Sequence, residues 1–474
     1  MAVPKRKSDD ATSESVLKDL GLWEQSDTLS WGARTGKNGT YTFVDLKQIG
    51  QSDDVTLTLD KLTLTGLHKV DGAGNFDRMD FDGLSVDQSD GQVSIKSATI
   101  SRPSPELAAE ILSILGDFSK VEDLNDLNIN IEDEDGFSLG AAYLEDFKIT
   151  SPENQIALAE LNYGEHEKTG KVSFEANTLR VKGMAENDIP LSISLDKALI
   201  HGLEQNMSGP TSPAKGDWAS NLSGGSFDQM LFENLDFNFD TLSLTSKGLQ
   251  ADSKTKGAIT QMSQVMKPVT IKVGVDAKTP QISALSDTLT GLGYDTLVFK
   301  GQQSTEVNKE TDTTRVFDSF FELEDGFTLN LDYDMSGVNK LQAMMESGAA
   351  DSASAQQDVL NALKINAAAM SLTDNSIMDR VFKLVAEKQG MSEGVIKMQA
   401  KSVLMLASLG ARSKEDGKVI SSVAGAIGDF IDDGGTLDIV MDPQAPLSIG
   451  AMQGLQSGQM PLSDLGLTAS VRKP

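Results

Sequence analysis

One eleven-residue phrase occurs twice in this chain, and it constrains the fold more than any other feature. The first copy, residues 57–67, reads LTLDKLTLTGL, and the second, residues 193–203, reads ISLDKALIHGL. A second phrase follows each copy: FDRMDFDGLSVD at 76–87 and FDQMLFENLDFN at 227–238. Repetition of this kind indicates one supersecondary unit used twice, so both copies are expected to fold alike. The stretch before residue 227 is rich in Ser, Gly and Pro and predicts a longer loop in the second copy.

Both copies alternate apolar and polar residues, which is the pattern of a half-buried β-strand. Turn-forming clusters separate these runs and favour antiparallel connections. The predicted fold class is therefore α+β, mainly β: an extended antiparallel sheet built from two related repeat units, with packed helices and a helical C-terminal region. The predicted divisions are a polar N-terminal segment (1–40), β-rich unit 1 (41–190), β-rich unit 2 (191–335) and a helical, Met-rich region with closing strands (336–474).

The composition changes after Tyr333, where Ala, Met, Gln and Lys become more frequent and the apolar spacing becomes helical. This spacing predicts helices at 338–347, 355–363, 377–387, 392–409 and 418–431, followed by strands at 436–441 and 465–471. Shorter helices are expected at 13–22 in the N-terminal segment and at 105–115 and 257–266 within the β-rich units.

The acidic charge balance of the chain argues against nucleic acid as a partner. The formal net charge is −29, whereas nucleic-acid binding requires clustered Lys and Arg. The chain has no cysteine, which excludes disulfides and thiolate chemistry. No run of about 18 apolar residues is present that would predict a membrane-spanning helix. No export signal is visible, so the expected localisation is the periplasm or cell envelope if a signal has been removed, and otherwise the cytoplasm.

No motif in the sequence predicts catalysis. His68, His166 and His201 are scattered, and Glu165-His166-Glu167 lies in a polar segment typical of a hairpin loop. The Asp133-Glu134-Asp135-Gly136 stretch lacks ligands that a calcium-binding EF-hand requires. Phosphate-binding loops and nucleophile elbows are absent. We therefore expect no enzymatic activity, no cofactor and no metal site.

Two interpretations of the apolar residues remain open. Helices that simply cover the sheet would make them an ordinary core, as layered domains normally do. Alternatively, tandem strand faces and adaptable methionines would form a groove for lipid or another apolar ligand. The candidate ligand-binding residues are Leu57, Leu64, Ile193, Ile200, Met378 and Met405. A third hypothesis is a structural protein that self-associates into layers or oligomers through open sheet edges.

The C-terminal region carries a family resemblance. The phrase LTDNSIMDRVFKLVAEKQGMS from Leu372, then Gly434-Gly435-Thr436-Leu437 and the Pro443–Pro446 segment, resembles uncharacterised alphaproteobacterial cell-envelope proteins. The strand phrases, punctuated by Gly-Leu and Phe-Asp, are similar to the AsmA-like and YdgA-like envelope families. The resemblance implies an export signal, an extended sheet with an apolar inner face, and a periplasmic role in lipid handling. It supplies no catalytic residue.

Overall fold

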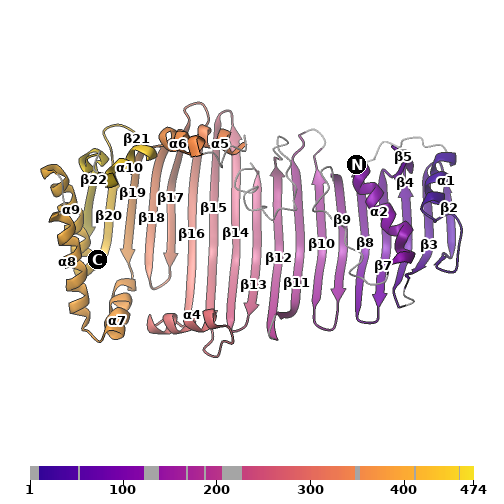
Figure 1. Ribbon diagram of the computed structural model, residues 1–474, viewed down its shortest axis with the longest axis horizontal. Coiled ribbons are helices and arrows are strands. Elements are labelled where there is room, and N and C mark those ends of the chain that lie inside the picture. Colours follow the sequence, from indigo (N-terminus) through magenta and orange to yellow (C-terminus); the bar gives the residue numbers. More distant parts are fainter. Residues whose placement is uncertain are drawn as a thin grey trace. The chain divides into compact units, whose positions relative to one another are not determined.

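A computed structural model of the chain describes residues 10–51, 54–121, 138–166, 169–185, 188–204, 227–346, 353–409, 413–457 and 460–473. The chain forms two compact units, Met1–Phe239 and Asp240–Pro474. Both consist mainly of antiparallel strands with helices packed against them, which confirms the predicted fold class (Figure 1). The division predicted at 190/191 falls instead near the start of a strand inside the first unit.

The first unit contains a sheet in which every pairing is antiparallel. β1 and β2 both pair with β3, and the order then runs β3, β4, β7, β8, β9, β10, β11, β12, β13. A separate small hairpin joins β5 and β6. The bounds are β1 (Leu29–Ser30), β2 (Ala33–Lys37), β3 (Thr40–Ile49), β4 (Thr56–Thr65), β5 (His68–Val70), β6 (Ala73–Asn75), β7 (Arg78–Gln88), β8 (Gly91–Pro103), β9 (Leu139–Thr150), β10 (Gln155–Glu165), β11 (Val172–Ala185), β12 (Ile189–Leu203) and β13 (Gln229–Phe239).

The two copies of the repeated phrases form strand pairs of the same register. In the first copy β4 pairs with β7, and Leu64 lies opposite Met79. In the second copy β12 pairs with β13, and Ile200 lies opposite Met230. Because the side chains of one strand face alternate with period two, equal register places corresponding residues on corresponding faces. Leu64 and Ile200 are thus a matched pair of positions in two different surroundings.

The glycine of each repeated phrase is required by the backbone. Gly66 and Gly202 both have positive φ, +71° and +69°, a conformation that residues with a Cβ rarely adopt. A Cβ at Gly66 would lie 2.2 Å from a carboxylate oxygen of Asp77, and one at Gly202 would lie 2.0 Å from that of Asp228. In each copy, the Gly of the Gly-Leu pair therefore lies directly beside the Asp of the Phe-Asp pair.

The strand alternation shifts by one residue in the middle of the sheet. In β4, Leu57 and Leu59 are buried, two exposed residues follow at Asp60 and Lys61, and burial resumes at Leu62. β3 shows the same buried–exposed pattern beside it. Two consecutive outward residues keep the apolar side chains of both strand halves on one face. The sequence pattern predicted alternation with period two along the whole strand, and the structure corrects this prediction at Asp60 and Lys61.

Two helices cover the β3–β8 part of this sheet (Figure 1). They are α1 (Asp10–Asp19) and α2 (Pro105–Asp117), the latter followed by a 3₁₀ turn, η1 (Phe118–Lys120). Ser104 caps α2 by accepting a hydrogen bond from the Leu107 N–H, and Pro105 occupies the first turn, where its missing N–H costs nothing. Full burial of each large aliphatic side chain in this core contributes about 1.5–3 kcal/mol.

The strands of the second unit are ordered β14, β15, β16, β17, β18, β19, β20, β22, with β21 paired to β19, and all of these pairings are antiparallel. Its strands are β14 (Leu242–Lys256), β15 (Ile259–Val273), β16 (Thr296–Asn308), β17 (Thr313–Leu323), β18 (Phe327–Ser336), β19 (Lys364–Asp374), β20 (Gly435–Met441), β21 (Leu447–Ser448) and β22 (Leu467–Arg472). Its helices are α4 (Pro280–Gly291), α5 (Val338–Glu346), α6 (Ala353–Ala362), α7 (Ile377–Gln389), α8 (Glu393–Leu409), α9 (Lys414–Asp433), α10 (Ile449–Ser457) and the 3₁₀ turn η5 (Leu462–Leu465).

The five helices predicted after Tyr333 are confirmed, as are the two closing strands. Two expectations were wrong. Residues 257–266, expected to be helical, belong mostly to β15, and β19 interrupts the region expected to be helical. In β15, Ile259, Met262 and Met266 mimic helical spacing, but pairing with β14 and β16 on both sides overrides that local signal.

Candidate functional site

One face of β9–β13 carries four rows of apolar side chains that cross the strands. The strand register places the members of each row directly opposite one another, so each row is continuous. We call these twenty residues the open apolar face. The rows are Ile149–Ile156–Val181–Ile193–Phe237, Phe147–Leu158–Leu179–Leu195–Leu235, Leu144–Leu161–Ala176–Ala198–Phe232 and Ala142–Tyr163–Phe174–Ile200–Met230.

The open apolar face continues the covered face of β3–β8. The register carries one row directly from Leu64 through Met79 and Ile100 to Ala142. The core cluster beneath α1 and α2 ends at β8, and apart from Ala198 the twenty residues are half-buried. Among the described residues, no helix is drawn over β10 to β12 (Figure 1). The sequence pattern is the same along the sheet, but only one part of the face has a covering layer.

The size of this face is unusual for an unpartnered surface. Five strands spaced about 4.8 Å apart span about 20 Å, and with about 25 Å of the length of each they give an area on the order of 500 Å². That value is toward the upper end of the apolar patches found on soluble proteins, about 300–600 Å², and patches of this size often have a function.

The smallest side chains at the centre of the open apolar face lie on β11 and β12. They are Ala176 and Ala198, which lie opposite each other. Larger residues form the rows on both sides, namely Leu179 and Leu195 on one side and Phe174 and Ile200 on the other. Ala198 is only 7% exposed although the core cluster does not reach it, because its larger neighbours screen it.

The opposite face of the same strands is polar and held by cross-strand ion pairs. The Arg180 guanidinium lies 2.7 Å from the Asp196 carboxylate, and the Lys197 ammonium lies 2.6 Å from Glu175. Hydrogen bonds from Arg180, and then from Asn234, hold the pKa of Asp196 below its ordinary value. The hydrogen bond from Lys197 lowers the pKa of Glu175 in the same way. This face therefore suits water, which leaves the apolar face as the one that needs a partner.

These lowered pKa values predict acid sensitivity. In the unfolded chain such a carboxyl group has a pKa of about 4, and in the folded protein its pKa is lower. The carboxylate therefore stabilises the fold at pH values above about 4, and this stabilisation is lost as the pH falls through the pKa of the folded protein. We expect Arg180→Met to lower the urea midpoint of the first unit at pH 7 and to change it much less at pH 3. Lys182→Met is the control, because Lys182 lies on the same strand and forms no ion pair with a described residue. Equal effects of Arg180→Met at both pH values would contradict the prediction.

The six candidate residues from the sequence are not brought together. Leu57 and Leu64 are core residues beneath the helices, with exposed fractions of 3% and 0%. Ile193 and Ile200 lie on the open apolar face. The remaining residues of that face were missed, although their apolar alternation is visible in the sequence, because the sequence does not show which strands a helix covers.

The two methionines belong to the second unit and lie in different surroundings. Met378 packs against the buried residues Phe382 and Ile431, inside the core formed by α7, α8 and α9. Met405, on α8, is 66% exposed. Met378 is thus a core residue, and Met405 is a surface residue.

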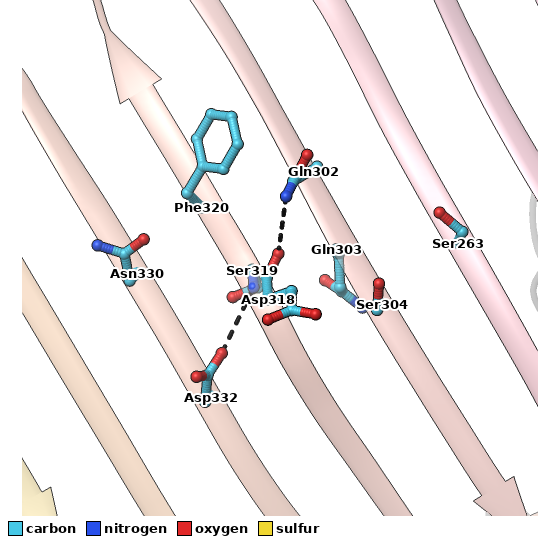
Figure 2. Close-up of a pocket in the computed structure, with 9 residues that line it drawn as sticks. All are labelled: Ser263, Gln302, Gln303, Ser304, Asp318, Ser319, Phe320, Asn330 and Asp332. Atoms are coloured by element: carbon cyan, nitrogen blue, oxygen red, sulfur yellow. Dashed lines mark hydrogen bonds between the residues drawn. The ribbon is translucent and has the colours of Figure 1, made fainter.

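A polar pocket of about 460 Å³ opens on the second unit (Figure 2). The Gln302 side-chain amide donates to the Asp318 carbonyl at 3.3 Å, and the Ser319 N–H donates to Asp332 at 3.4 Å. The register shift between β16 and β17 displaces these side chains, a feature that no sequence motif signals. Two carboxylates and no cation line the pocket, so it suits hydroxylated or cationic molecules and disfavours anions. The lining residues are Ser263, Gln302, Gln303, Ser304, Asp318, Ser319, Phe320, Asn330 and Asp332.

The three histidines remain dispersed, each beside a local oxygen. The Nδ1 atoms of His68, His166 and His201 lie 2.7 Å from the Gly66 carbonyl, 3.1 Å from Thr169 Oγ1 and 2.7 Å from Ser173 Oγ, respectively. Within the described ranges, no group of three or more His, Asp or Glu side chains is placed to hold a metal ion. Glu167 and the 133–136 turn lie outside those ranges.

Comparisons with known proteins assign neither a fold nor a function to this chain. A family model described as "Uncharacterized protein" matches residues 320–472, from the end of β17 to β22. No curated protein matches the chain. A solved structure, OmpTdeltaL8 (a loop L8 deletion mutant of OmpT), an outer membrane protein of Vibrio cholerae, is similar at 10% identity and a TM-score of 0.15. That similarity covers 70% of this chain and 83% of the other. None of the helices in the described residues combines the length and apolar character needed to cross a membrane.

Proposed function

We propose that this chain is a non-enzymatic protein of the cell envelope that binds the acyl chains of a lipid along its sheet. The observation that carries the proposal is the open apolar face of β9–β13: four continuous apolar rows, a polar opposite face, and no helical layer among the described residues. A sheet with one apolar face requires a partner for that face, because leaving it in water forfeits about 25 cal/mol for each Å² of apolar surface.

The chemistry of the face favours an acyl chain. Nineteen of the twenty side chains are hydrocarbon or thioether, and only Tyr163 carries a hydroxyl. Such a surface offers no basis for recognising a polar ligand, whereas its continuous apolar rows can contact the hydrocarbon of an acyl chain along their length. The five strands span about 20 Å, comparable to an extended acyl chain of a membrane lipid.

The proposed location follows from what the partner would be. Lipid acyl chains are available in envelope membranes, and a chain without cysteine is compatible with an oxidising compartment. The resemblance of the strand phrases and of the C-terminal phrase to envelope proteins supports the same location. The two pairs of a hydroxyl and an imidazole, Ser173 with His201 and Thr169 with His166, are exposed to water and lie outside the polar pocket, which supports a binding role.

The experiment is native mass spectrometry combined with lipid extraction, using protein purified from its own envelope fraction. We expect the wild-type chain to retain lipid, and Ile193→Asn with Ile200→Asn to reduce retention at least tenfold. Leu199→Asn is the matched control, because it makes the same kind of change one residue away, on the opposite face of β12. The control should retain lipid as the wild type does.

Three outcomes would reject the proposal. They are absence of lipid from the wild type, equal loss of lipid in the Leu199 control, and retention by the double variant. The assembly hypothesis predicts a different result: a defined oligomer in the same spectra that dissociates when Ile193 and Ile200 are replaced. That oligomer would identify a second copy of the chain as the partner of the open apolar face.

A further inference from the structure

A second apolar surface lies on α8, in the other compact unit. Met398, Val403, Met405 and Leu406 are 61–67% exposed, and Val395 is 36% exposed. At 100° per residue these five positions fall within one arc of about 160° around the helix. The other exposed positions in that arc are Gln399 and Ser402, both uncharged. We call this surface the α8 apolar arc.

The rest of α8 holds the arc in a fixed orientation. Ile396 is buried, and Ala400 and Leu404 pack with it against the cluster that includes Phe382 and Ile431. The helix is therefore part of a packed core and does not need a further partner to be folded. Large apolar side chains that remain exposed on a well-anchored helix indicate an interaction surface.

The two lysines of α8 lie outside the arc and form ion pairs. The Lys397 ammonium lies 3.1 Å from Asp379 of α7, and Lys401 pairs with Asp432 of α9. The described side chains of the arc carry no charge, so the attraction of the arc for a partner is hydrophobic.

We propose that the α8 apolar arc docks on the surface of a zwitterionic lipid bilayer, with its side chains inserted at the boundary between headgroups and acyl chains. Methionine and leucine side chains adapt to a fluid apolar phase. A helix of 17 residues, about 25 Å long, suits a position in the plane of the interface.

A second copy of the chain fits the arc less well, for two reasons. Five partly exposed side chains cover on the order of 500 Å², whereas a stable protein interface takes about 800 Å² from each partner. In addition, two chains of net charge −29 repel each other, while a zwitterionic bilayer has no net charge to oppose docking.

The test is flotation of the full chain with phosphatidylcholine vesicles. We expect the wild type to float, and the triple variant Met398→Asn, Met405→Asn and Leu406→Asn to partition at least tenfold more weakly with an unchanged melting temperature. Raising the salt concentration from about 50 to about 500 mM should leave wild-type flotation unchanged, since no cation of the arc takes part. Val275→Asn is the control, because Val275 is 76% exposed but lies outside α8.

Failure of the wild type to float would overturn the proposal, as would flotation of the triple variant. A concentration-dependent dimer in light scattering that the triple variant abolishes would assign the arc to a second copy instead. The proposal does not depend on the open apolar face. Ile193→Asn with Ile200→Asn should float normally, so the two proposals can fail separately.

Discussion

Leu64→Asp is expected to abolish cooperative folding of the first unit. The Leu64 side chain is 0% exposed and lies between Tyr41 and Met79 in the strand register. A carboxylate there would be buried without a cation or a hydrogen-bond donor, so it would either ionise at great cost or remain protonated and unsatisfied. We expect a loss of more than about 4 kcal/mol in the free energy of unfolding. Tryptophan emission during urea titration measures this loss, because Trp23 and Trp31 pack against the same core.

The repeat supplies the matched control, Ile200→Asp. Ile200 corresponds to Leu64 in sequence and register, but it is half-buried on the open apolar face, where a carboxylate reaches water. We expect this variant to lose only about 1 kcal/mol, the range typical of strand-propensity changes at exposed positions. A loss as large as that of Leu64→Asp would show that another layer covers the open apolar face, and would remove the basis of the proposed function.

Gly466→Ala is expected to be strongly disruptive in the second unit. Gly466 precedes β22 with φ of +59°, and a Cβ there would lie 2.0 Å from the backbone oxygen of Asp442. The left-handed conformation alone costs a residue with a Cβ about 1–2 kcal/mol. Relief of the backbone collision requires β22 to move away from β20, so we expect a total loss of at least about 3 kcal/mol.

Gly390→Ala separates the collision from the conformational penalty. Gly390 ends α7 with nearly the same dihedral angles, but nothing lies within 4 Å of the position that a Cβ would occupy there. This variant should lose only the conformational penalty. Hydrogen exchange followed by mass spectrometry should show lost amide protection in β20 and β22 for Gly466→Ala and none there for Gly390→Ala. Equal losses in stability would contradict the proposed role of the contact with Asp442.

Local patterns were sufficient for much of the secondary structure. Helical spacing located α7, α8 and α9, and Pro105, a residue tolerated in a first helical turn, located α2. These signals succeed because they depend on side chains within one or two turns of each other. The pattern failed at β15, where strand pairing with distant residues decided the conformation, and it gave no sign of the pocket on β15 to β18.

The sequence by itself determined that two copies of a strand phrase exist, with an apolar face on each, because alternation and the Gly and Asp positions are local properties. The tertiary structure decided whether a helical layer packs against each face. Leu64 and Ile200 occupy equivalent positions, yet α1 and α2 belong to segments outside the repeated phrases and pack only against the strands from β3 to β8. Burial depends on residues far away in the chain, so identical patterns produced a core at Leu64 and an open surface at Ile200.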